Sequence, residues 1–172
     1  QLLWPTGDAQ DVAVCWLLIW MGLGSGMLVR QLGAGTWGAI VAAAAAMTSP
    51  YLTVWLLHPH GATIVWLPWI LLCMERNRPI ALAICTAGLL MGGHPETAFH
   101  SGLLVTTWWL VRNRRPMSIF GMFFGTLLSG PIVLPFVEEV LRSATLSAHG
   151  GNTLAMAQLL ELVSQVMRHI QY

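Results

Sequence analysis

The sequence predicts an all-α protein: a polytopic transmembrane helical bundle of about six membrane helices, followed by a C-terminal amphipathic helix. Apolar residues occupy 56% of the 172 positions and charged residues 9%, well below the roughly 25% charged residues of a soluble domain. The mean hydropathy of +0.67 leaves too little polar surface to cover a water-soluble globule. The apolar residues form continuous runs, which excludes the alternating pattern of membrane strands.

The apolar runs define the six expected membrane segments. In chain order they cover about 12–29, 36–47 with a continuation toward 57, 62–74, 80–91, 97–111 and 117–137. Several are shorter than the roughly 20 residues that cross a bilayer at about 1.5 Å per residue. Short segments are tolerated where they tilt little, end at a water-filled cavity or lie behind shielding neighbours.

The turns between these segments alternate in charge. Arginines fill every second turn, namely Arg30, then Arg76 and Arg78, then Arg112, Arg114 and Arg115. The other turns hold Asp8 and Asp11, His58 and His60, then His94, Glu96 and His100, and finally Glu138, Glu139 and Arg142. The positive-inside rule places the arginine turns in the cytoplasm and the N-terminus outside. Any chemistry of the His and Glu side chains is then expected on the extracytoplasmic side.

Composition changes after the last apolar run. We expect a transmembrane domain over 1–143, a Gly- and Ser-containing linker over 144–153 and an amphipathic interfacial helix over 154–172. Apolar residues recur in the last segment at helical spacing, at Leu159, Leu162, Val163, Val166 and Ile170. No basic stretch with interleaved aromatic residues suggests a nucleic-acid partner.

Small residues four apart predict close helix packing. Gly22 and Gly26 form one such pair, and Gly121 and Gly125 form another. The first pair contains a GxGxG pattern, but no strand precedes it, which argues against a nucleotide-binding fold. The three cysteines lie inside apolar runs without metal-ligand spacing, so we expect them to be small buried side chains.

The densest polar cluster runs from Gly92 to His100. Its glycines end one helix, and Pro95 begins the next with Glu96 in the first turn. His94 and Glu96 either cap helix ends, or hold an anionic head group with Glu96 as acid, base or metal ligand. His94 and His100 are too far apart in sequence for the zinc geometry of an HExxH helix, so no metal ligands are assigned.

Two further clusters lie on the same side. His58 and His60 follow a broken apolar segment and either line a cavity or belong to an aromatic anchor at the membrane interface. Glu138 and Arg142 have i,i+4 spacing and form either a solvated pair or part of the rim of a substrate cavity.

These motifs together resemble the YfhO-type bacterial membrane proteins over about 12–148. The resemblance rests on a Gly-rich span ending at Arg30, the pair His58 and His60, and the stretches 66–69, 75–76, 93–99 and 135–142. The stretch 93–99 is similar to the family's Gly-His-Pro-Gln-Thr-Ala motif, with Glu96 in place of the usual Gln. The family has a GT-C-like glycosyltransferase fold, and the chain is identified as its central portion.

The resemblance implies transfer of a sugar from a polyprenyl-phosphate donor to an extracytoplasmic acceptor, in the bacterial inner membrane. It implies a catalytic role for Glu96 and substrate-binding roles for His58, His60, His94, His100, Glu138 and Arg142. The cofactor is unknown: the implied chemistry accommodates a divalent metal, and the lipid-linked sugar is the donor. Because the family's catalytic acidic loop has no convincing counterpart here, enzymatic activity stays open. The alternative is a non-catalytic accessory subunit of a larger membrane complex.

Overall fold

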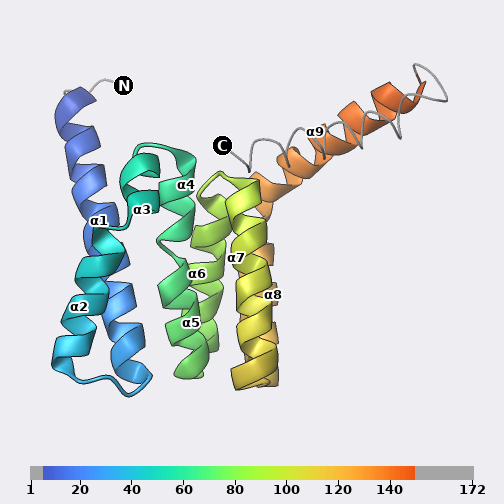
Figure 1. Ribbon diagram of the computed structural model, residues 1–172. Helices are drawn as coiled ribbons and strands as arrows, with labels where there is room; N and C mark the ends of the chain where they lie inside the picture. The colour runs from blue at the N-terminus through green and yellow to red at the C-terminus, as the bar shows by residue number, and fades with distance from the viewer. Residues whose placement is uncertain (1–5, 150–172) are drawn as a thin grey trace. The chain divides into compact units, whose positions relative to one another are not determined.

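The computed structural model describes residues 6–149, and every regular element in that range is helical. The chain divides into two compact units (Figure 1). The first unit ends at Gly130, and the second begins at Pro131. The predicted all-helical class is therefore confirmed for the described part of the chain.

The first two expected membrane segments are present. Helix α1 spans Thr6–Gln31, α2 spans Thr36–Met47, and α3 (Pro50–Trp55) continues α2 after a short interruption. The ranges Gln10–Gln31 and Thr36–Trp55 are each long and apolar enough to cross a membrane. The continuation of the second segment beyond Pro50 is thus confirmed.

The third expected segment, 62–74, is not one helix. It is divided between α4 (Pro59–Ile64) and α5 (Leu67–Glu75). Pro68 lies in the first turn of α5, where its missing N–H costs nothing. The same ring inside a continuous helix would remove a hydrogen bond and clash with the preceding turn, so the helix restarts there.

Three short helices complete the first unit. They are α6 (Pro79–Met91), α7 (Pro95–Trp108) and α8 (Pro116–Leu128), and each begins at a proline as expected. One π-helical turn, η1 (Trp109–Asn113), extends α7. Its C-cap is Arg114, whose φ of 40° reverses the chain toward α8.

The sixth expected segment, 117–137, is also interrupted. Helix α8 ends at Leu128, and α9 (Gly130–His149) begins after Ser129 because Pro131 suits the start of a helix. Counted by length and composition, the described residues hold two candidate spans, or three if α8 and the part of α9 up to Arg142 form one broken span. Helix α9 includes 144–149, where a linker is expected; residues 150–172, with the expected amphipathic helix, lie outside the described range.

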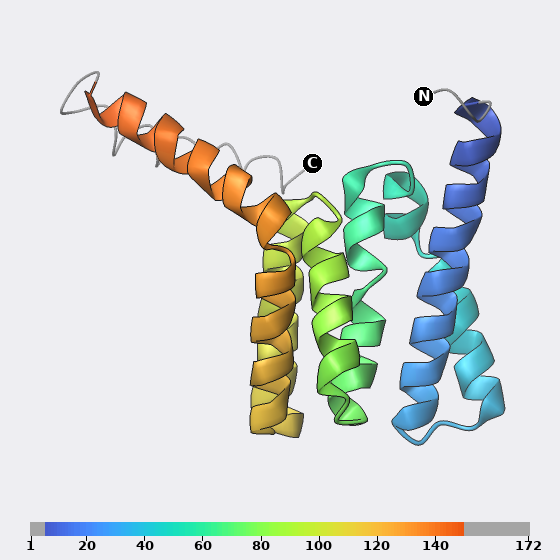
Figure 2. The same ribbon diagram turned by 180° about the vertical axis from the view of Figure 1, so that it is seen from behind.

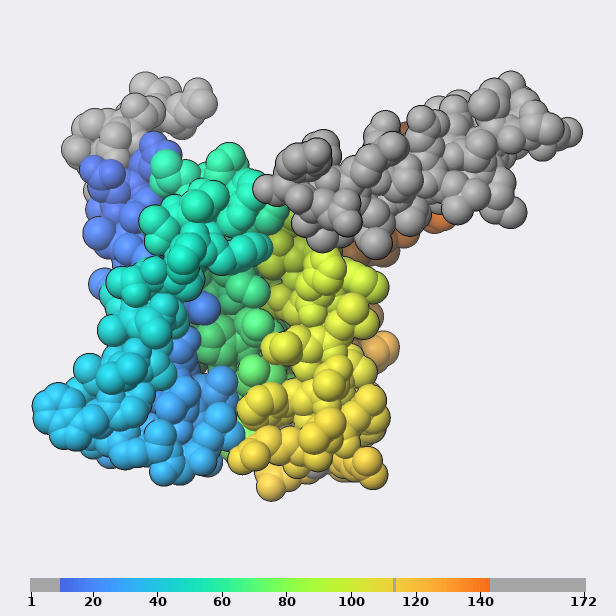
Figure 3. All heavy atoms as spheres, in the orientation of Figure 1, coloured from blue at the N-terminus to red at the C-terminus, as the bar shows by residue number. Residues whose placement is uncertain are grey.

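The core of the first unit lies around α5. Its buried apolar side chains are Ile70, Leu71, Cys73, Met74, Leu82, Cys85, Leu89 and Val105, contributed by α5, α6 and α7. Helix α2, by contrast, has no buried residue and lies at the outer surface (Figure 3). An apolar helix that is exposed in this way is suited to a lipid environment.

Both glycine pairs lie at close helix contacts, as predicted. A Cβ on Gly26 would lie 3.0 Å from the Ala39 carbonyl oxygen of α2. On α8, a Cβ on Gly121 would lie 2.8 Å from the carbonyl oxygen of Pro79, and one on Gly125 would lie 2.5 Å from that of Ala83. The absence of side chains at these positions therefore allows the backbones to approach, as in small-residue membrane interfaces.

Candidate functional site

The structure brings together two of the predicted histidine turns. The rings of His60, in α4, and His94, at the start of α7, stack with centroids 3.4 Å apart. The close approach depends on Gly92, where a Cβ would lie 2.5 Å from Oγ1 of Thr63 in α4. The sequence placed both histidines at one end of the bundle, and the structure adds their direct contact.

His94 caps α7. Its Nδ1 accepts a hydrogen bond from the backbone N–H of Thr97 at 3.1 Å and lies 2.8 Å from the Thr97 hydroxyl. A nitrogen that accepts from an amide carries no proton, so the neutral ring of His94 holds its proton on Nε2. The capping role considered for His94 is therefore present.

His60 has a different environment. Its ring stacks on Trp55 at 4.4 Å as well as on His94, and its buried Nδ1 has no hydrogen-bond partner among the described residues. Burial is the main cause that lowers the pKa of His60 from its ordinary value of 6.5, followed by the neighbouring His94. His60 therefore favours the neutral form.

Glu96 and His58 flank this pair. Glu96 lies in the first turn of α7 and acts against the lowering of the His60 pKa, whereas His58 adds to it. His58 also contacts Trp55, with ring centroids 5.4 Å apart. The interface-anchor and cavity interpretations of the His58 and His60 turn both remain compatible with these contacts.

His100 stands apart from the pair. It is exposed on α7, and its ring contacts that of the neighbouring Phe99. Within the described residues, the structure places no group of three or more His, Cys, Asp or Glu side chains in an arrangement that could hold a metal ion. The histidine cluster is therefore built from His58, His60, His94 and Glu96.

Glu138 and Arg142 belong to α9 and the second unit. Oε1 of Glu138 lies 2.6 Å from Nη2 of Arg142, and both side chains are more than three-fifths exposed. The i,i+4 pair expected from the spacing is thus present, and its exposure matches the solvated-pair interpretation. Such pairs contribute little to stability because water screens them.

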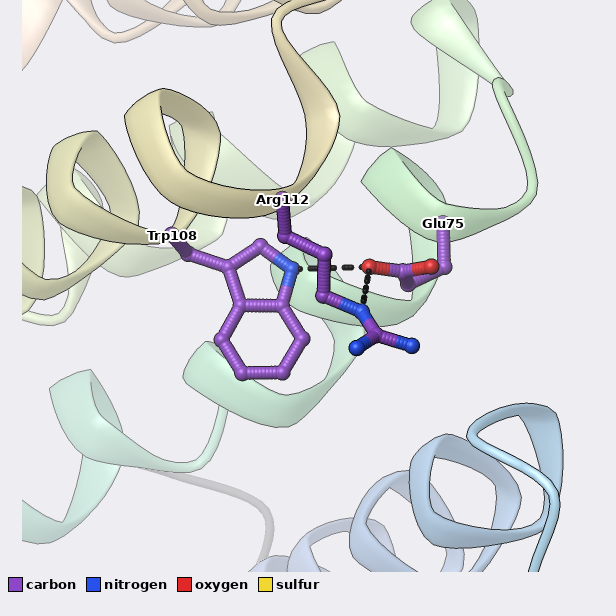
Figure 4. Close-up of polar contacts among 3 residues, drawn as sticks. All are labelled: Glu75, Trp108 and Arg112. Atoms are coloured by element: carbon purple, nitrogen blue, oxygen red, sulfur yellow. Dashed lines mark hydrogen bonds and ion pairs between the residues drawn. The ribbon is translucent and has the colours of Figure 1, made fainter.

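A polar contact that the sequence analysis missed lies at the arginine end of the first unit (Figure 4). Oε1 of Glu75 accepts a hydrogen bond from the indole N–H of Trp108 at 2.9 Å and pairs with Nε of Arg112 at 3.0 Å. The guanidinium also lies over the Trp108 ring, 5.7 Å from its centroid. The Glu75 carboxylate thereby joins α5 to α7 and η1. In the sequence, the feature that could have indicated this contact is a single acidic residue next to the arginine turns.

An open groove runs along α1 and does not involve the candidate residues. It is lined by Asp11, Val12, Cys15, Trp16 and Ile19, all from one helix. Apart from the Asp11 carboxylate and the Cys15 thiol, its lining is aliphatic or aromatic, and it holds no cationic group for a phosphate. The polar chemistry of the first unit is therefore concentrated at the histidine cluster and the arginine end.

Comparison with known proteins adds no relative. No protein-family model, no curated protein and no solved structure matches the chain. The resemblance to YfhO-type proteins rests on the sequence motifs alone, and the function inferred from it is a proposal.

Proposed function

We propose that the chain is part of a GT-C-like membrane glycosyltransferase whose histidine cluster binds the phosphate of a polyprenyl-phosphate-linked sugar. The observation that carries the proposal is the direct stacking of His60 and His94 beside Glu96 at one end of the first unit. Polar side chains gathered on irregular backbone at the edge of apolar helices commonly mark a substrate path.

The chemistry needs hydrogen-bond donors and a carboxylate. In sugar transfer, the acceptor oxygen bonds to the anomeric carbon while the bond from that carbon to the phosphate oxygen breaks. Nε2–H of His94 and the N–H of neutral His60 are suited to donate to the departing phosphate. Glu96 is suited to accept the proton of the acceptor hydroxyl.

The membrane arrangement forms part of the same proposal. We place the chain in the bacterial inner membrane with about six membrane segments, the N-terminus outside and the arginine turns in the cytoplasm. The candidate spans Gln10–Gln31 and Thr36–Trp55 support it, as does the alternation of charged turns. In this arrangement the short helices α5 to α8 form the remaining membrane segments, together with the helices from which they are separated by a break: α4 before α5, and α9 after α8.

The test is binding of a polyprenyl phosphate to the purified full chain in mild detergent, with the unphosphorylated polyprenol as reference. We expect a preference for the phosphate in the wild type that falls about ten-fold in His60→Phe and in His94→Asn. Phe has no donor, and the amide of Asn is too short to reach the position of Nε2 in His94. Phe keeps the stack on Trp55, and Asn can still cap α7. The matched control is His100→Phe, which should bind as the wild type does.

Equal binding of phosphate and alcohol by the wild type would contradict the proposal. So would an equal loss in His60→Phe and His100→Phe, because the phosphate would then not be recognised by the stacked pair. Circular dichroism of each variant shows whether the helices are retained.

The alternative is a non-catalytic accessory subunit of a larger membrane complex. The observation that favours it is the exposed face of α2, where the side chains of Trp37, Ile40 and Val41 are 80%, 52% and 66% exposed. Such a face packs against lipid or against another membrane protein. Isolation from native membranes with a partner at fixed stoichiometry, unaffected by His60→Phe, would favour the subunit.

A further inference from the structure

The arginine end of the first unit carries a second cluster of functional groups, separate from the histidines. Helix α6 begins at this end and leads to the Gly92–His94 turn at the other. Its 13 residues correspond to about 20 Å. A ligand at the start of α6 is therefore distinct from one bound at the histidine cluster.

The packing of α6 on α8 places two arginine turns next to each other. Gly121 faces the carbonyl of Pro79, and Gly125 faces that of Ala83, so the two helices run parallel with a constant offset. Figure 2 shows them side by side. Because Gly121, the sixth residue of α8, faces Pro79, the first residue of α6, the two helix starts are staggered. Arg78 and Arg115 therefore lie at the same end of the packed pair, with Arg115 about one turn further out.

The charge at this end is not balanced by the protein. Glu75 is already engaged by Trp108 and Arg112, and Arg76 donates to Oε1 of Gln31 at 3.1 Å. The side chains of Arg78 and Arg115 are exposed, and neither makes a hydrogen bond or ion pair to another described residue. Glu75 is thus the one carboxylate paired with an arginine at this end among the described residues, and the exposed guanidinium groups of Arg78 and Arg115 are left to solvent or to an anion.

The surface beside these arginines is apolar. Ile80 follows Arg78 and is 80% exposed, while Met117 and Phe120 on α8 are 48% and 56% exposed. Two exposed guanidinium groups at the same end of exposed apolar helix surfaces match a phospholipid, whose phosphate lies directly above its acyl chains. Arg recognises phosphate oxygens with two parallel N–H donors.

We propose that Arg78 and Arg115 bind the phosphate of an anionic phospholipid, with Ile80, Met117 and Phe120 against its acyl chains. The paired positive charges select an anionic head group over a zwitterionic one. The site lies at the N-terminal ends of α6 and α8, where a bound lipid would hold the two helix ends together.

The experiment adds equal amounts of phosphatidylglycerol and phosphatidylcholine with identical acyl chains to delipidated full-length protein in mild detergent. Native mass spectrometry then gives the ratio of the two bound lipids. We expect a preference for phosphatidylglycerol that falls about five-fold for each of Arg78→Gln and Arg115→Gln, the fold-change equivalent to about 1 kcal/mol per basic residue at a membrane surface. Neither side chain caps its helix, so the variants should fold.

Two controls separate a site from general attraction. Arg30→Gln combined with Arg142→Gln removes the same total charge elsewhere and should leave the ratio unchanged. Arg78→Lys combined with Arg115→Lys keeps the charge but loses the two parallel N–H donors, so it should lower the preference by less than the paired Gln substitutions do. Equal binding of the two lipids by the wild type, or an equal loss in the control pair, would overturn the proposal.

Discussion

At the scale of single residues, two stacked imidazoles take different roles because their nitrogens have different partners. Nδ1 of His94 is occupied by the N-terminus of α7, whereas Nδ1 of His60 is buried without a partner. His60 therefore prefers the neutral form, and its protonation would place a charge against His94. A proton on His60 therefore opposes the stacked arrangement.

The first prediction concerns this protonation. The unfolded chain takes up a proton on His60 near pH 6.5, whereas the folded chain does so at lower pH. The contribution of His60 to stability is thus complete above pH 6.5 and is lost as the pH falls toward its folded-state pKa. The midpoint of thermal unfolding in detergent should fall over this range, and His60→Phe should reduce the fall. His100→Phe, as the control, should keep the pH profile of the wild type. If His60→Phe also keeps it, the assignment of this pH dependence to His60 is wrong.

The second prediction compares the two ion pairs. The side chain of Glu75 is 17% exposed and accepts from both Trp108 and Arg112, whereas that of Glu138 is 63% exposed. We expect Glu75→Gln to lower the free energy of unfolding by about 1 kcal/mol, and Glu138→Gln to change it by less than about 0.5 kcal/mol. Chemical denaturation in detergent measures both. Equal changes in the free energy of unfolding for the two variants would show that burial does not strengthen the interactions of Glu75.

At the scale of elements, the sequence predicted helix positions well and helix interruptions poorly. The starts at Pro79, Pro95 and Pro116 follow directly from proline chemistry after a polar turn. The breaks near Pro68 and Pro131 were missed because proline inside an apolar run is compatible with a kinked membrane helix as well as with a new one. Tertiary packing decides whether such a proline kinks a helix or begins a new one, and a single sequence does not reveal that packing.

The candidate site was likewise predicted only in part from the sequence. The alternation of charge predicted that His60 and His94 share one end of the bundle, but their contact depends on how closely α4 approaches Gly92. The pairing of Glu75 with Arg112 likewise joins residues 37 positions apart. Local spacing gives no information about such contacts.

The third prediction tests the close approach of α6 and α8. Gly125→Leu places a side chain against the backbone of Ala83, where a Cβ alone would lie 2.5 Å from the carbonyl oxygen. We expect a loss of about 1–3 kcal/mol in the free energy of unfolding, as for other overpacked contacts. The matched control is Gly102→Leu on α7, where a Cβ would meet nothing within 4 Å. A comparable loss in the control would contradict the assignment of this contact.

At the scale of the whole molecule, the first unit has two chemically different ends. One carries the arginines with a single engaged carboxylate, and the other carries the stacked histidines with Glu96. The helices between them are shorter than the roughly 30 Å of a bilayer core: α6 and α8, with 13 residues each, correspond to about 20 Å. In the proposed topology the two ends nevertheless face opposite aqueous phases.

The most direct test labels one introduced cysteine at a time from one side of sealed, oriented membrane vesicles. The background is Cys15→Ser because Cys15 is exposed, whereas Cys73 and Cys85 are buried. Gly35→Cys and Met117→Cys report on the arginine end, and Leu57→Cys and Met91→Cys on the histidine end. We expect a membrane-impermeant maleimide to label Leu57→Cys and Met91→Cys from the extracytoplasmic side, and Gly35→Cys and Met117→Cys only after the vesicles are opened. Labelling of all four from the same side would contradict the proposed topology.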